Sequence, residues 1–107
     1  ADVFVSIHID SSNSAQAGGV TAYYAGGSAE GQRLAASLHA ENMKVTNFDD
    51  RGVRTANFYV LNHTTMPAAL LELGFISNPA EEKILNTDSQ QQKFAESIVA
   101  GLRKYFR

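Results

Sequence analysis

The residue with the clearest chemical potential is Glu72, which lies in the otherwise apolar run of residues 67–76. A carboxylate in such a run leaves water when the chain folds, so we expect the pKa of Glu72 to be raised. A carboxyl group with a raised pKa exchanges protons near neutral pH, as general acid–base catalysis requires. The alternative is a structural carboxylate at a strand end, paired with a cation.

His8 is the second candidate, because it stands among the β-branched residues of the strand-like run 3–9. Alternate residues of a strand share a face, so Ser6, His8 and Asp10 would point to one side. Asp10 could orient the imidazole as the outer partner of a metal ligand, or it could simply begin the following turn. The alternative for His8 is a structural histidine. His63, in a loop, could line a pocket or be solvated.

Several other chemistries are excluded. The chain has no cysteine, so a thiol nucleophile and thiolate metal sites are impossible, and any metal must use His, Asp or Glu. The sequence contains no nucleophile elbow, phosphate-binding loop, dinucleotide fingerprint or HExxH motif. A His and a Glu on separate strands remain, and these are some of the residues that the active site of a zinc hydrolase needs.

Composition places the chain among ordinary globular proteins. Its 107 residues fit a single domain spanning residues 1–107, with 44% hydrophobic and 19% charged residues. A net charge of −2 argues against nucleic acid as the main partner, since phosphate binding needs a clustered positive surface. No run is long and apolar enough to predict a membrane span.

Periodicity and capping signals predict alternating strands and helices. Ser28, Asn78 and Thr87 are the predicted N-caps, Glu81 is expected to bond back to Asn78, and His39 should lie on a helix surface. Strands are predicted at 3–9, 20–24, 58–61 and 68–76, a turn at 49–52, and helices at 28–42, 78–86 and from 87 onward, the last with a stripe of Phe94, Ile98, Leu102 and Phe106.

This alternation predicts an α/β domain with a mainly parallel twisted sheet flanked by helices. Sites in such sheets gather at the carboxyl ends of the strands. His8 and Glu72 both stand late in their strands. If those strands are neighbours, we expect the two side chains to face one crevice.

Residues 4–10, 18–24 and 66–79 look like the zinc-dependent N-acetylmuramoyl-L-alanine amidases of the Amidase_3 type. These are peptidoglycan hydrolases of autolysins, sporulation enzymes and phage endolysins. The resemblance implies that His8 ligates Zn²⁺ and that Glu72 is the catalytic carboxylate. It implies hydrolysis of the amide between N-acetylmuramic acid and L-alanine, with Glu72 moving a proton from water to the leaving amine. Peptidoglycan would be the partner, in the cell wall or periplasm or as the target of a secreted or phage-encoded lysin.

The chain departs from the family pattern in its zinc ligands. Family domains open with a strand ending in a DPGHGG-like motif, followed by a Glu ligand on the next helix, and this sequence contains neither. We therefore expect the C-terminal part of a catalytic domain, lacking the strand–helix–strand–helix portion, which another chain could supply. The competing hypothesis is an inactive fragment or non-catalytic wall-binding module, and a third is a zinc peptidase cutting within the stem peptide.

Overall fold

One four-stranded sheet, in the order β1-β4-β2-β3, organises the chain. The computed structural model describes residues 1–107. β1 runs parallel to β4 and β2 parallel to β3, whereas β2 is antiparallel to β4. The predicted mainly parallel α/β sheet is confirmed. The strands are β1 (Phe4–Asp10), β2 (Val20–Tyr24), β3 (Asp50–Thr55) and β4 (Ala68–Phe75).

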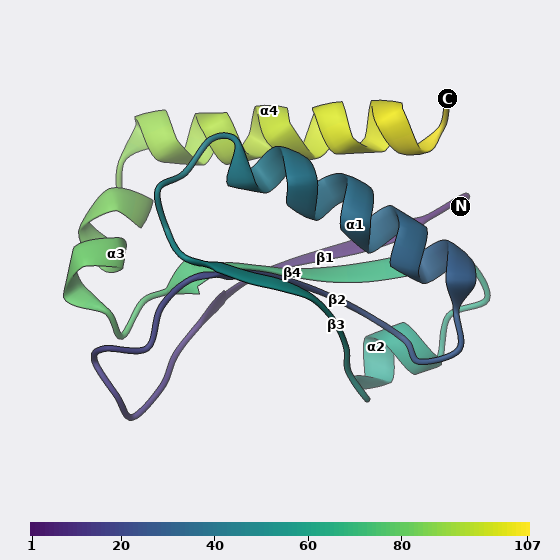
Figure 1. Cartoon of the computed structure of the whole chain (residues 1–107), viewed down its shortest axis with the longest axis horizontal. Helices are drawn as coiled ribbons and strands as arrows, with labels where there is room; N and C mark the ends of the chain where they lie inside the picture. The colour runs from purple at the N-terminus through teal and green to yellow at the C-terminus, as the bar shows by residue number, and fades with distance from the viewer.

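The helices are distributed unevenly over the two faces of the sheet. Figure 1 shows α1 and α4 side by side along one face, with α3 beyond the end of the sheet. The single-turn helix α2 lies on the other side. The bounds are α1 (Ala29–Met43), α2 (Tyr59–Asn62), α3 (Pro79–Leu85) and α4 (Asp88–Tyr105). None of these helices combines the length and apolarity that crossing a membrane requires.

Side-chain alternation along β4 separates the two faces. Ala69, Leu71 and Leu73 point toward α1 and α4 and belong to the main core. Ala68 and Leu70 point the other way and form a small cluster with a leucine of α2. Buried residues of the main core are Val20, Ala22, Leu34, Ala35, Leu38, Phe48, Ala69, Leu71, Leu73, Phe94 and Tyr105.

Glu72 follows Leu70 in this alternation, so it lies on the face away from α1 and α4. Its register partners are His8 on β1 and Thr21 on β2, which point to the same side. We call this surface the site face and define it by Ser6, His8, Thr21 and Glu72. Helix α2 covers only one end of it (Figure 1).

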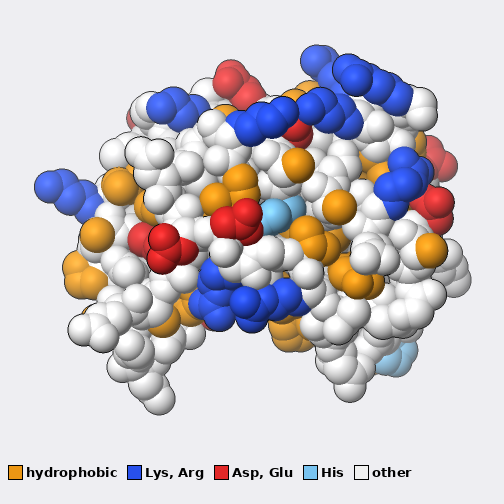
Figure 2. Space-filling model, in the orientation of Figure 1, with side chains coloured by type: hydrophobic (Ala, Val, Ile, Leu, Met, Phe, Trp, Pro, Cys, Tyr) orange, Lys and Arg blue, Asp and Glu red, His pale blue; other side chains and the backbone are white.

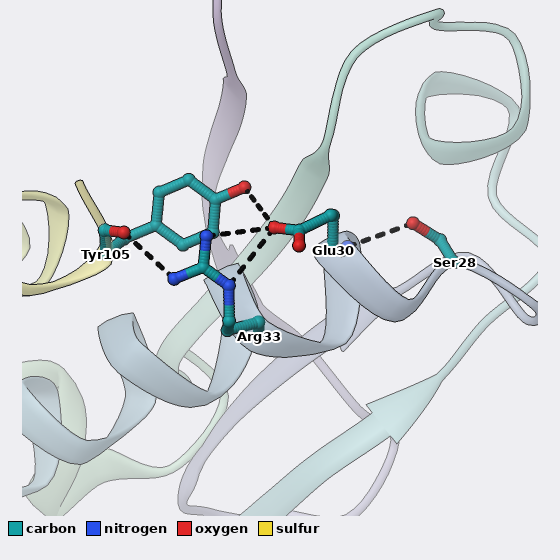
Figure 3. Close-up of polar contacts among 5 residues, drawn as sticks. Ser28, Glu30, Arg33 and Tyr105 are labelled. Atoms are coloured by element: carbon teal, nitrogen blue, oxygen red, sulfur yellow. Dashed lines mark hydrogen bonds and ion pairs between the residues drawn. The ribbon is translucent and has the colours of Figure 1, made fainter. Parts of the chain in front are cut away.

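A polar cluster ties the beginning of α1 to the end of α4 (Figure 3). The Arg33 guanidinium donates to Glu30 Oε2 and to the Tyr105 carbonyl, and it stacks 4.0 Å from the centroid of the Tyr105 ring. The Tyr105 hydroxyl also donates to Glu30 Oε2, at 2.9 Å. These bonds hold the two helices in register over the core.

The charge pattern of α4 follows the helix dipole. Arg103 and Lys104 occupy its last turn, where positive charge is favourable, and Lys104 also pairs with Glu41 of α1. Figure 2 shows several Lys and Arg side chains along the edge over α4, a second group near the centre of this view, and scattered hydrophobic side chains. The basic C-terminus is thus explained within the fold.

The predicted helix starts are confirmed. The side chains of Ser28, Asn78 and Thr87 each accept a backbone N–H in the first turn of the helix that follows. The predicted return bond from Glu81 to Asn78 is wrong. Glu81 is buried and accepts the N–H groups of Gly19 and Phe75 instead, because the carboxylate is directed under the end of β4.

Two predicted elements are also wrong. Residues 49–52 are not an isolated turn, since β3 begins at Asp50 and pairs with β2, while Gly52 at φ +84° absorbs the local irregularity. Residues 58–61 are not a strand, because α2 begins at Tyr59, and Phe58 at its N-cap position packs edge-on against Tyr23. A short apolar run contains too few residues for its hydrophobic periodicity to distinguish a helix from a strand.

Two predicted side-chain positions differ as well. His39 is buried rather than exposed, because α1 lies on the sheet and brings its imidazole 2.6 Å from Asp50 Oδ1. Phe106 is 55% exposed, and Tyr105 takes its place in the core. Three helical turns span about 10.8 residues, so Tyr105 lies directly above Phe94 whereas Phe106 has drifted off the stripe.

Candidate functional site

His8 and Glu72 lie directly opposite each other on adjacent parallel strands. Both strands run toward the same edge of the sheet, so both residues approach its carboxyl-terminal end, where sites of α/β proteins form. The side chains share the site face. The condition set by the sequence is met, because the two strands are neighbours and bring this His and this Glu to one face. That the two side chains line a single crevice stays a prediction.

Glu72 carries a strongly perturbed carboxyl group. Burial raises its pKa to about 7, with a further increase from the nearby Asp10 carboxylate and a decrease from the Arg51 guanidinium. Oxygen Oε2 is buried without a hydrogen-bond partner. A half-buried carboxyl group with this pKa can accept or donate a proton near neutral pH.

Ser6 and Asp10 flank His8 on β1 but interact differently. Ser6 Oγ lies 2.6 Å from His8 Nε2, so the hydroxyl contacts the imidazole. Asp10 Oδ1 instead accepts the N–H of Ser11 at 2.7 Å and begins the turn after the strand. In this structure Asp10 therefore acts on the site through its charge near Glu72 and makes no hydrogen bond to His8.

His63 lies away from the Glu72 end of the site face. It follows α2 and precedes β4, and therefore lies near the opposite end of that strand. Its ring stacks on Tyr59 at a centroid distance of 3.9 Å, and Nδ1 contacts the Tyr59 carbonyl. The structure does not bring His63 together with His8 or Glu72.

A bulge in β4 adds a residue that sequence reasoning missed. The register shifts by one residue between His8 and Asp10, and Gly74 adopts φ +145°, which favours glycine. As a result Phe75 becomes the partner of Asp10 and turns onto the site face. Gly74, two residues after Glu72, is the sequence feature that could have predicted this bulge, because an isolated glycine in a strand often marks one.

Arg51 was missed because residues 49–52 resemble a turn. Its guanidinium lies 5.0 Å from the centroid of the Phe75 ring and acts on the charge of Glu72. The sequence predicts a capping role for Glu81, but its two oxygens accept the N–H of Gly19 at 2.9 Å and the N–H of Phe75 at 2.8 Å. These bonds fix the ends of β2 and β4 beside the candidate site.

The residues present fit only part of a metal centre. His8 offers an imidazole nitrogen and Glu72 a carboxylate, but no group of three or more His, Asp or Glu side chains is close enough to hold a metal ion. A catalytic zinc ion normally takes three protein ligands and a water. This chain alone therefore does not form a complete zinc site.

Comparison with known proteins gives a consistent set of relatives. The sequence model of the Amidase_3 family, described as N-acetylmuramoyl-L-alanine amidase, matches residues 1–104. The probable cell wall amidase LytH of Staphylococcus epidermidis is 42% identical over 105 residues, which cover 98% of this chain and 35% of that protein. The chain thus spans about a third of the length of this curated relative.

Solved structures agree in fold. The catalytic domain of CwlV, an N-acetylmuramoyl-L-alanine amidase from Bacillus (Paenibacillus) polymyxa var. colistinus, superposes with a TM-score of 0.93 at 40% identity. An N-acetylmuramoyl-L-alanine amidase from Clostridium difficile 630 gives 0.94 at 35% identity. Each match covers 99% of this chain and 58% of the solved chain. By sequence and by fold, this chain belongs to the N-acetylmuramoyl-L-alanine amidase family.

Proposed function

We propose that this chain forms part of the catalytic domain of a peptidoglycan amidase. The reaction is hydrolysis of the amide that joins the lactyl group of N-acetylmuramic acid to L-alanine. The observation that carries this proposal is the Glu72 carboxyl group, half-buried with a pKa of about 7, opposite His8 on the neighbouring strand. Membership of the amidase family supports the choice of bond.

Glu72 acts as the proton carrier in this proposal. Its carboxylate accepts a proton from the attacking water and then donates that proton to the nitrogen of the departing L-alanine. A group with a pKa near neutrality suits both halves of the exchange, because neither protonation state is strongly favoured. Oε2 is buried and has no hydrogen-bond partner, and the half-buried side chain as a whole remains partly open to solvent.

His8 would be one ligand of a zinc ion, with Ser6 holding its ring. Zinc, when bound, would act as a Lewis acid on the amide carbonyl. The other ligands would come from the portion of the domain that this chain does not span. In keeping with the name of the LytH relative, the site of action would be the bacterial cell wall.

The bond specificity is tested by the new end groups after purified peptidoglycan is digested with the complete catalytic domain. We expect free L-alanine amino termini, lost on chelation and restored by Zn²⁺. Amino termini of any other stem residue would instead support a peptidase that cuts within the stem peptide.

The competing proposal is a non-catalytic wall-binding module, and the absence of a three-residue metal cluster favours it. Zinc content of the complete domain separates the two. We expect close to one zinc per chain, lost on His8→Ala and retained in His63→Ala, because the ring of His63 is stacked on Tyr59 away from Glu72. A metal-free domain that binds peptidoglycan without cleaving it would support the wall-binding module.

A further inference from the structure

Arg51 is the cation whose charge acts on Glu72. Crossing the sheet from β1, the neighbouring positions are His8, Glu72, Thr21 and then the start of β3, where Arg51 follows Asp50. Asp50 pairs with Val20 and faces α1, where it bonds His39, so Arg51 points the other way. The guanidinium therefore lies on the same side of the sheet as the Glu72 carboxyl group.

The Arg51 side chain is held in place by two structural features. Gly19 has φ +113° and no side chain, and a Cβ there would lie only 2.7 Å from Arg51 Cγ, so the glycine gives the arginine stem its room. The guanidinium then lies over the Phe75 ring, which the Gly74 bulge has turned onto this face. The half-buried Arg51 side chain therefore has a defined position, between Gly19 and the Phe75 ring, without any ligand bound.

Its charge is nevertheless unmatched. No carboxylate oxygen lies within 4.0 Å of the Arg51 guanidinium, which forms no side-chain hydrogen bond. Arg33 shows the contrast, because its guanidinium is engaged by Glu30 and Tyr105 (Figure 3). An arginine fork that is positioned but unpaired is suited to bind a carboxylate with two parallel hydrogen bonds.

We propose that Arg51 forms an anion subsite that binds a carboxylate of the stem peptide close to the bond being cleaved. This inference rests on the proposed function. The lactyl carboxyl group is itself tied up in the amide, so a free carboxylate near the bond must belong to the peptide. The subsite would therefore place the leaving amine relative to Glu72.

The geometry also limits how far that carboxylate lies from the amide. Arg51 and Glu72 are two strand spacings apart, about 10 Å between backbones. The Arg51 side chain covers part of this distance over Gly19 and Phe75. An extended peptide advances about 3.3–3.6 Å per residue, so the bound carboxylate sits within about two residues of the scissile amide.

The test compares two substrates in the complete, zinc-loaded catalytic domain. One is N-acetylmuramoyl-L-alanyl-D-glutamate, and the other is the same compound with both glutamate carboxylates converted to amides. We expect wild-type kcat/KM to favour the carboxylate substrate by about 10- to 100-fold, the range of a charge-assisted hydrogen bond. Arg51→Met keeps the apolar stem over Gly19 and Phe75 and should abolish this preference, while Arg51→Lys should restore part of it.

The matched control is Arg103→Met, which removes an equal charge from the exposed last turn of α4 and should keep the wild-type preference. Because Arg51 also lowers the pKa of Glu72, its loss affects both substrates, and only the ratio between them reports the subsite. No preference in the wild type, or an equal loss for both substrates in Arg51→Met, would overturn the inference.

Failure of the proposed function gives a different result, in which the wild type cleaves neither substrate. Binding of the free dipeptide L-alanyl-D-glutamate, measured by calorimetry, then decides the subsite. We expect binding at least tenfold weaker in Arg51→Met than in the wild type and in Arg103→Met. Equal Kd values in all three proteins would overturn the subsite.

Discussion

His8 and Glu72 are register partners on β1 and β4, two parallel strands that lie far apart in the sequence and adjacent in the sheet. The pairing places a potential metal ligand and a potential proton carrier on one face, near the ends of both strands. It depends on the strand order β1-β4-β2-β3, in which β4 is inserted between β1 and β2. The chemistry proposed for the chain follows from this arrangement.

The pH dependence of activity should report the Glu72 carboxyl group. Its pKa is raised to about 7, and the base form is the one that accepts a proton from water. We expect kcat/KM of the complete domain to fall about tenfold per pH unit below that value. An apparent pKa near the ordinary glutamate value, in initial rates measured between pH 5 and 9, would contradict this assignment.

Stability should show the opposite trend with pH. Burial raises the pKa of Glu72 from 4.5 to about 7, so the folded state holds this proton more tightly than the unfolded state does. Its contribution to the free energy of unfolding is complete below pH 4.5 and is lost as the pH rises toward 7.

Glu72→Gln removes this pH-dependent loss, because glutamine does not titrate. At pH 8 we expect the metal-free variant to be about 1 to 3 kcal/mol more stable than the metal-free wild type, with little difference at pH 4. Urea denaturation with a chelator present measures both values. A variant less stable than the wild type at pH 8 would contradict the burial of charge at this position.

Glu81 should be essential for stability although it carries no proposed catalytic role. Each of its oxygens accepts a buried backbone N–H, from Gly19 and from Phe75. Glu81→Gln retains one acceptor and should cost about 1.5 to 3 kcal/mol, and Glu81→Ala more. The control is Glu82→Gln, one residue along α3 and exposed, which should change stability by less than about 0.5 kcal/mol. Equal unfolding midpoints for Glu81→Gln and Glu82→Gln would refute this role.

The isolated 107-residue chain should self-associate. Ile7 and Ile9 of the edge strand β1 lie on the face of the sheet that carries the main core, yet they are 55% and 43% exposed. With Ile76 and Leu85 they line an apolar groove of about 370 Å³ that also reaches α4. Exposed apolar patches and open strand edges both promote association.

Light scattering at increasing concentration measures this association. Replacing Ile7 and Ile9 together by Thr should shift the chain toward monomer, because threonine keeps the β-branched shape and reduces the apolar area. A stable wild-type monomer at 100 µM or so would contradict the expectation.

Much of the site could be predicted because its signals are local. The apolar surroundings of Glu72 indicate a raised pKa, the β-branched run around His8 indicates a strand, and sites form where parallel strands end. The caps Ser28 and Asn78 were predictable for the same reason, since a capping side chain acts within one helical turn.

The remaining features depend on contacts between distant segments. In the sequence, Arg51 resembles a turn residue. Its position near the site depends on the bulge at Gly74, which places the Phe75 ring under its guanidinium. Glu81 has a suitable local partner at the helix start, yet two backbone N–H groups from elsewhere in the chain bind it instead. A histidine in a helix is expected at the surface because its side chain is polar. His39 is buried because Asp50, from the distant strand β3, gives its imidazole a hydrogen-bond partner.

The most direct test of the account is the rate at which L-alanine amino termini are released from purified peptidoglycan by the complete zinc-loaded domain. We predict that Glu72→Gln lowers this rate by about 10²- to 10⁴-fold, the contribution of a positioned acid–base group, while Glu82→Gln matches the wild type. Release at the wild-type rate by Glu72→Gln would contradict the central claim that Glu72 carries the proton in amide hydrolysis.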